Sequence, residues 1–175
     1  EATAYPELTE LITQLQQWDR KADAESVGAG IFAVFYNQLR PYYQALPEPK
    51  IFSPATILKA LTNTKAYLIN HFNSTEIKLG DYQKLVRGSK EIPIFGLPDV
   101  ITAMAARPYK DGKVKVVSGE SYIELVRFTS SGPEIESVIS YGSSDREESP
   151  HYADQMELYS QFKTKKMTLD KEKIY

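Results

Sequence analysis

Three residues with potential for hydrolytic chemistry lie close together late in the sequence: Ser149, His151 and Asp154. A serine, a histidine and an acid form the triad in which the histidine acts as a base and activates the hydroxyl as a nucleophile. Triad members must converge on one point, whereas neighbours within one turn of chain point in divergent directions. We therefore expect His151 to form a structural hydrogen bond across a loop, and we assign no catalytic residue to this chain.

The other histidine and the one acidic run give no clear metal site. His71 lies near the end of an apolar segment, where a packed or surface role is the simpler interpretation and a catalytic role stays open. Neither histidine belongs to a two-histidine motif such as HExxH. The run Asp145-Arg-Glu-Glu148 could attract a cation, but its spacing matches no calcium loop, so we expect a solvated loop and no metal.

Composition excludes several other classes of function. The chain has no cysteine, which removes thiolate catalysis, disulfides and cysteine-ligated zinc. Its 21 basic and 23 acidic residues give a net charge of −2, which offers no case for binding nucleic acid. The longest apolar cluster, Ile31 to Tyr36, is too short to span a membrane. The glycine pair Gly28-Ala-Gly30 follows no predicted strand and is not a dinucleotide fingerprint, so no cofactor is predicted.

Tyrosines are numerous, and three of them gather near prolines. The chain has twelve tyrosines, and Tyr36, Tyr42 and Tyr43 lie close to Pro41. Such a surface can bind a ligand or a partner, and it can equally pack against polypeptide outside this sequence.

The first part of the sequence, residues 1–110, predicts mainly helices and loops. A helix opens at Pro6 and a buried one covers Ile31 to Leu39, ended by Pro41. Ser53-Pro54 is a helix start, and the helix runs to about Phe72. Its expected inward residues are Ile57, Leu58, Leu61 and Leu68. Between Leu79 and Pro98 we expect loops with at most a short helix near Tyr82 to Val86, and one or two helical turns over Asp99 to Ala106.

The second part, residues 111–175, predicts strands and a terminal helix. Turns are expected at Asp111-Gly112, Ser118-Gly119 and Gly132-Pro133. The strands between and after these turns cover 114–116, 122–128 and 135–141, which together suggest an antiparallel meander. Ser149-Pro150 predicts the start of the terminal helix, with Met156 and Tyr159 on one face. The fold class is α+β, and we expect the 175 residues to form a single segment.

Three stretches resemble the penicillin-acylase family of N-terminal-nucleophile hydrolases, on the branch of acyl-homoserine-lactone and aculeacin-type acylases. The first is Leu15-Gln-Gln-Trp18-Asp19. The second is Leu79-Gly-Asp-Tyr-Gln-Lys-Leu-Val-Arg-Gly88, followed by Ile92-Pro93, Phe95-Gly96 and Asp99-Val100. The third and strongest runs from Asp111-Gly112 through Gly119-Glu-Ser121 and Tyr141-Gly142 to Ser149-Pro-His-Tyr-Ala-Asp-Gln155. Two residues depart from the family pattern: Ser143 replaces the usual Gln and Glu147 the usual Pro.

The resemblance implies the C-terminal part of an acylase β-subunit, a piece of an αββα fold. Family members use an N-terminal residue, usually Ser, as nucleophile and its own α-amine as base. Because this sequence begins with Glu1-Ala2, we expect the nucleophile to lie elsewhere and the chain alone to be inactive. The implied partner is the rest of the acylase polypeptide, with self-association if the chain is isolated.

The implied location is periplasmic or secreted, with any export signal outside this sequence. Two alternatives stay open beside the acylase portion. One is a non-catalytic ligand- or partner-binding module derived from that fold, and the other is a stand-alone enzyme with an unrecognised site.

Overall fold

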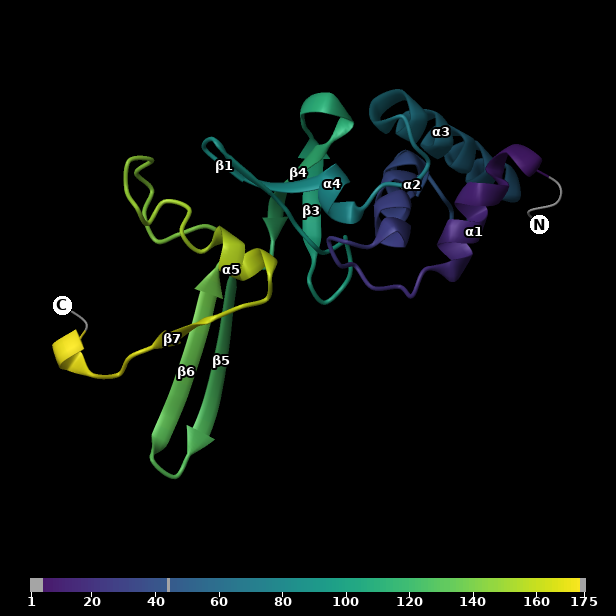
Figure 1. The fold of residues 1–175 in the computed structure, drawn as a ribbon. Coiled ribbons are helices and arrows are strands. Elements are labelled where there is room, and N and C mark those ends of the chain that lie inside the picture. Colours follow the sequence, from purple (N-terminus) through teal and green to yellow (C-terminus); the bar gives the residue numbers. More distant parts are fainter. Residues whose placement is uncertain (1–4, 44, 174–175) are drawn as a thin grey trace.

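The computed structural model describes residues 5–43 and 45–173. Figure 1 shows helices on one side of a sheet, and a ribbon of strands that reaches away from that sheet on its other side. None of the helices in the described ranges has the length and apolar character needed to cross a bilayer. The mixture of helices and mostly antiparallel strands confirms the predicted α+β class.

Helices dominate the first part of the chain. They are η2 (Pro6–Leu8), α1 (Thr9–Gln17), α2 (Val27–Tyr43), α3 (Pro54–Phe72) and the short α4 (Leu79–Tyr82). The predicted start of α3 is confirmed, because the Ser53 hydroxyl accepts a hydrogen bond of 3.1 Å from the backbone N–H of Thr56. Asn73 ends α3 in a left-handed conformation with φ 52°.

The first sheet has four strands in the order β2-β1-β4-β3. Its members are β1 (Gln83–Arg87), β2 (Lys90–Pro93), β3 (Met104–Pro108) and β4 (Val114–Gly119). The β1–β4 pair is parallel, and the β1–β2 and β3–β4 pairs are antiparallel. The buried Gln83 side chain donates to the carbonyls of Phe95 at 3.1 Å and Gly96 at 2.9 Å, which ties β1 to the chain after β2.

The second sheet has three antiparallel strands in the order β5-β6-β7. They are β5 (Tyr122–Thr129), β6 (Gly132–Ile139) and β7 (Lys165–Met167), with the helix α5 (Met156–Ser160) between the last two. A final turn, η4, covers Lys171–Lys173. The β5–β6 pair is the ribbon that extends from the body in Figure 1.

Two separate apolar clusters hold the fold together. The first joins the three long helices to α4 and the near end of the sheet, through buried residues that include Leu11, Ile31, Leu68, Leu79 and Val114. The second joins the sheet to α5 and β6, through buried residues that include Leu85, Met104, Val138, Met156 and Tyr159. The four-stranded sheet therefore contributes to both clusters.

Three predictions were wrong for segments that form strands in the structure. The segment Leu79 to Pro98 holds a β-hairpin, because strand β1 buries Gln83 and Lys84 beside Leu85 and so shows no alternation of polar and apolar residues. The predicted helical turns before Ala106 give way to β3, which pairs with β4. The expected meander is divided, because β4 belongs to the first sheet and β5 to the second.

Two helix boundaries and the orientation of one helix residue also differ from prediction. Helix α2 runs past Pro41 to Tyr43, because a proline in the last turn removes only one hydrogen-bond donor. Ile57 in α3 is 38% exposed and does not face inward. The terminal helix begins at Met156, and the Ser149-Pro150 pair forms turns before it.

Candidate functional site

Arg87, at the end of β1, organises the loop that carries the strongest motif. Its guanidinium donates a hydrogen bond of 2.7 Å to the carbonyl of Ser144. It also lies over two aromatic rings, 4.4 Å from the centre of Tyr152 and 5.0 Å from the centre of Tyr141. Such cation–π contacts hold a charged group against a ring face. Arg87 thereby fixes the loop of residues 141–155 to the β1–β2 hairpin.

The two ends of this loop are closed by backbone contacts. The Gln155 N–H donates to the Tyr141 carbonyl at 2.8 Å, and the Ser144 N–H donates to the His151 carbonyl at 3.1 Å. A Cβ at Gly142 would lie only 2.1 Å from the His151 carbonyl oxygen, so the closure requires glycine there. The motif residues therefore shape this loop.

His151 has a structural contact, but it is local and does not cross the loop, and it joins two residues that were expected to point apart. Its Nδ1 lies 2.9 Å from a carboxylate oxygen of Asp154. The Ser149 hydroxyl accepts a hydrogen bond of 3.2 Å from the backbone N–H of His151, so it meets the backbone and not the imidazole. The structure brings these three residues together as a turn and does not align them as nucleophile, base and orienting acid.

The acidic run and the two departures from the family pattern lie at the rim of the same loop. A cavity of about 320 Å³ is lined there by Arg87, Lys90, Glu147, Asp154 and their neighbours. Glu147 reaches over the β1–β2 turn, where a Cβ at Gly88 would lie 2.7 Å from its Oε1. Ser143 is exposed. Across the described ranges, no group of three or more acidic or histidine residues is arranged to hold a metal ion.

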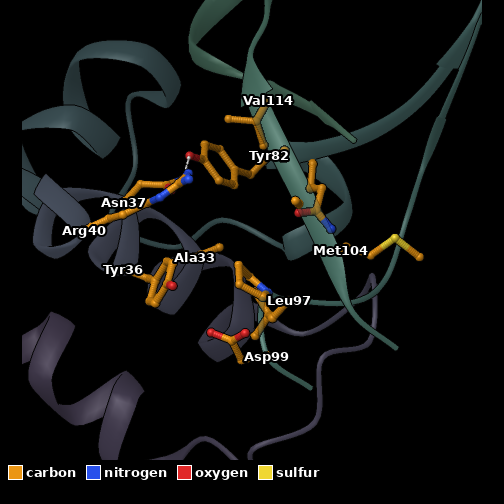
Figure 2. Close-up of a pocket in the computed structure, with 13 residues that line it drawn as sticks. Ala33, Tyr36, Asn37, Arg40, Tyr82, Leu97, Asp99, Met104 and Val114 are labelled. Carbon is orange, nitrogen blue, oxygen red and sulfur yellow. Dashed lines mark hydrogen bonds between the residues drawn. The ribbon is translucent and has the colours of Figure 1, made fainter. Parts of the chain in front are cut away.

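A second cleft lies between α2 and the strands β3 and β4, as Figure 2 shows. It has a volume of about 220 Å³ and continues into a neighbouring hollow of about 420 Å³. The two hollows share Asn37, Arg40, Tyr82, Ala106 and Val114. Both are open to solvent at the C-terminal half of α2.

Polar groups gather at the α2 side of this cleft. The Asn37 amide donates a hydrogen bond of 2.9 Å to the Tyr82 hydroxyl, drawn as a dashed line in Figure 2. Arg40 forms no ion pair within the part of the chain that the structure describes. Asp99 lies at the other side, in a left-handed backbone conformation with φ 60°.

These groups are suited to binding a polar ligand. Burial raises the pKa of Tyr82 to about 12, so its hydroxyl stays protonated near neutral pH. Burial also raises the pKa of Tyr67, which lines the neighbouring hollow. The cleft offers hydrogen-bond donors and one cation, and none of its lining residues is a serine, threonine, cysteine, lysine or histidine. The lining therefore holds no serine, threonine or cysteine nucleophile beside a histidine or lysine base, and Asp99 is its one carboxylate.

The remaining candidates from the sequence have packing contacts. His71 stacks near Tyr67, with ring centres 4.4 Å apart, and covers Gly112. Tyr36 lines the cleft, whereas Tyr43 packs with Phe52, at a ring separation of 6.3 Å. The predicted tyrosine surface is therefore divided between two places.

Sequence reasoning missed the two residues that organise these sites, Arg87 and Tyr82. Both lie inside the second family-like stretch, Leu79 to Gly88. The ring contacts of Arg87 depend on Tyr141 and Tyr152, which are far away in the sequence. The signal that could have found them is that an arginine and a tyrosine lie inside a stretch that already resembles the family.

The sequence comparisons agree with the resemblance. The family model of penicillin amidase matches residues 2–175, and the chain therefore belongs to the penicillin amidase family. The class of protein is therefore that of the penicillin amidases, with the mixed helices and strands of an α+β fold.

Individual relatives are acylases. The chain is 31% identical to "Acyl-homoserine lactone acylase PvdQ" from Pseudomonas savastanoi pv. phaseolicola, over 87% of this chain and 22% of that protein. It is 28% identical to "Aculeacin-A acylase" from Actinoplanes utahensis, over 90% of this chain and 21% of that protein. The chain thus spans about a fifth of the length of the curated relatives it matches.

Among solved structures, a thermostable penicillin G acylase from Alcaligenes faecalis matches 95% of this chain and 34% of its own. The sequence identity is 18% and the TM-score is 0.30.

Proposed function

We propose that this chain is the C-terminal, structural portion of an acylase β-subunit whose parent protein hydrolyses the amide bond of N-acyl substrates. The substrates would be of the penicillin or acyl-homoserine-lactone type. One observation carries the proposal: the family model matches residues 2–175, while the chain covers only 22% of a full-length relative. A segment of that size fits a part of the enzyme better than the whole.

The geometry supports a structural role for this portion. The motif residues near His151 close a loop and hold it to Arg87. The cleft at Tyr82 has no nucleophile beside a base. The bond-breaking groups of the parent, an N-terminal nucleophile with its α-amine and the donors that hold the oxyanion, would then come from the rest of the polypeptide.

A location in the periplasm or outside the cell is part of the proposal, and it is supported only by the family resemblance. Fractionation of the native host, followed by immunodetection of the protein, tests it. Detection in the cytosolic fraction alone would contradict this location.

The second candidate function is a non-catalytic binding module derived from the same fold. The cleft between α2 and the strands favours it, because Asn37, Arg40 and Tyr82 present donors and a cation around a hollow. In that case a longer polypeptide would bind a ligand at the cleft and hydrolyse nothing.

Hydrolysis of a panel of N-acyl substrates tests the two candidates together. The panel holds acyl-homoserine lactones of several chain lengths and penicillin-type amides. It is offered to the 175-residue chain and to a polypeptide extended by the upstream coding sequence. We expect hydrolysis only by the extended form, and hydrolysis by neither form would favour the binding module.

Hydrolysis by the short chain would overturn both candidates. The control for that outcome is His151→Gln in the short chain. Loss of its activity would trace the chemistry to the pair formed by His151 and Asp154.

A further inference from the structure

The second sheet separates apolar from polar side chains between its two faces. Residues directly opposite one another on paired strands point to the same face. The register places Val126, Ile135 and Met167 in one row across all three strands. Phe128 with Pro133, and Tyr122 with Ile139, form further rows on that side, because strand residues two apart share a face. We call these seven residues the apolar face.

The opposite face of the sheet is polar where it leaves the body. At its base, Ile123 and Val138 pack into the second apolar cluster. Further out, the same face carries Leu125 opposite Glu136, and then the ion pair of Arg127 with Glu134. One end of this face therefore packs against the second apolar cluster, and the other end is polar enough to contact water.

The apolar face is exposed mainly along β5 and at Met167, whereas Ile135 and Ile139 on β6 are half-buried. Phe128 is 85% exposed, Tyr122 50%, Val126 46% and Met167 43%. Burying such apolar side chains is favourable, so an exposed row of them favours a partner. One polar row crosses this face, with Glu124 opposite Ser137 and Ser137 opposite Lys165. A partner must therefore be mainly apolar and accommodate this polar row.

We infer that the apolar face is an internal interface, covered by a segment of the same acylase polypeptide that lies outside these 175 residues. This inference rests on the proposed function. The curated relatives are between four and five times as long as the matched region, since it covers 22% of their length, so most of the parent chain has to pack against something. A segment of the same polypeptide has a high effective concentration and competes well against a second copy. Strand β5 is also an edge strand, which can accept a further strand beside it.

Thiol accessibility in the extended polypeptide tests this inference. The 175 residues contain no cysteine, so Val126→Cys places a single reporter on the apolar face. Leu125→Cys is the matched control, since it is the next residue on the same strand, on the opposite face, with 57% exposure against 46% for Val126. The rate of thiol labelling is measured by mass spectrometry of the peptide that carries β5. This rate is expressed relative to the labelling rate of the same variant in denaturant.

We expect the V126C thiol to react at least about tenfold more slowly than the L125C thiol, because reaction then requires local opening. Equal rates would overturn the inference. Protection of V126C that disappears on dilution would also overturn it, because the cover would then be a second copy.

The substrate panel is run on the unsubstituted extended protein, so that a failure of this inference can be distinguished from a failure of the acylase proposal. Protection of the V126C thiol without hydrolysis would support the interface and contradict the acylase proposal.

Discussion

Arg87 shows how one side chain can join distant parts of this family pattern. It lies in the second family-like stretch, and the Ser144 carbonyl that it contacts is 57 residues further along the chain. The guanidinium lies over the rings of both Tyr141 and Tyr152, and it still donates to a backbone carbonyl. A lysine cannot present a planar group between two rings, which explains why this position suits arginine.

At the same scale, the pH dependence of stability should contain a contribution from Tyr82. Burial raises its pKa from an ordinary 10.0 to about 12, so the unfolded chain loses this proton at a lower pH than the folded chain. Between pH 10 and pH 12 the unfolded state holds fewer protons, and the free energy of unfolding therefore falls as pH rises. Two pKa units correspond to about 3 kcal/mol.

Tyr82→Phe should flatten this alkaline slope and cost about 1 kcal/mol at pH 7, where it loses the hydrogen bond from Asn37. Urea unfolding of both proteins across that pH range measures the difference. A slope that is as steep in Y82F as in the unsubstituted chain would show that Tyr82 does not carry this effect. Burial raises the pKa of Tyr159 to about 12 as well, so part of the slope should remain.

At the scale of elements, segments with local signals were predictable and those that depend on distant pairing were not. The N-cap Ser53 and Pro54 fix the start of α3 by contacts within four residues. The β1–β2 hairpin gave no such signal, because its burial arises from neighbours on both sides of the sheet. Strand β3 was missed for the same reason, since it forms by pairing with β4.

The candidate site divides in the same way. The contact between His151 and Asp154 was predictable, because the two residues are three positions apart. The cleft was not, because it requires Arg40 of α2 to face Tyr82 and Val114 across the fold.

A glycine in α2 tests how closely this helix approaches the rest of the fold. A Cβ at Gly30 would lie 2.1 Å from the carbonyl oxygen of Ile77 and 2.9 Å from the backbone nitrogen of Leu79. Gly→Ala inside a helix normally gains up to about 1 kcal/mol. At this position the clash with backbone should reverse the sign, so that Gly30→Ala destabilises by about 1–3 kcal/mol.

The matched control is Arg40→Ala, an exposed position on the same helix. It should change the free energy of unfolding by less than about 0.5 kcal/mol. Thermal and urea unfolding followed by circular dichroism compare the two variants. A stabilised Gly30→Ala would mean that α2 does not contact the segment before α4 in solution.

At the scale of the whole molecule, this chain has two apolar clusters and a ribbon that neither cluster covers. The clusters share the four-stranded sheet, so the helical part and the part with α5 are connected through β1 and β4. The ribbon of β5 and β6 meets the second cluster only at its base, through Ile123 and Val138. This unequal burial agrees with the proposal that another segment of a longer polypeptide packs against the ribbon.

The 175-residue chain on its own should therefore self-associate. Phe128 is 85% exposed and Val126 46%, and without the rest of the polypeptide their most accessible cover is another copy of the same face. Sedimentation velocity at micromolar concentration should show species larger than the monomer that shift with dilution. Phe128→Ser should weaken this association, whereas Leu125→Ser, on the polar face of the same strand, should leave it nearly unchanged. A monodisperse monomer would show that the apolar face tolerates water, and it would remove the physical reason to expect a covering segment there.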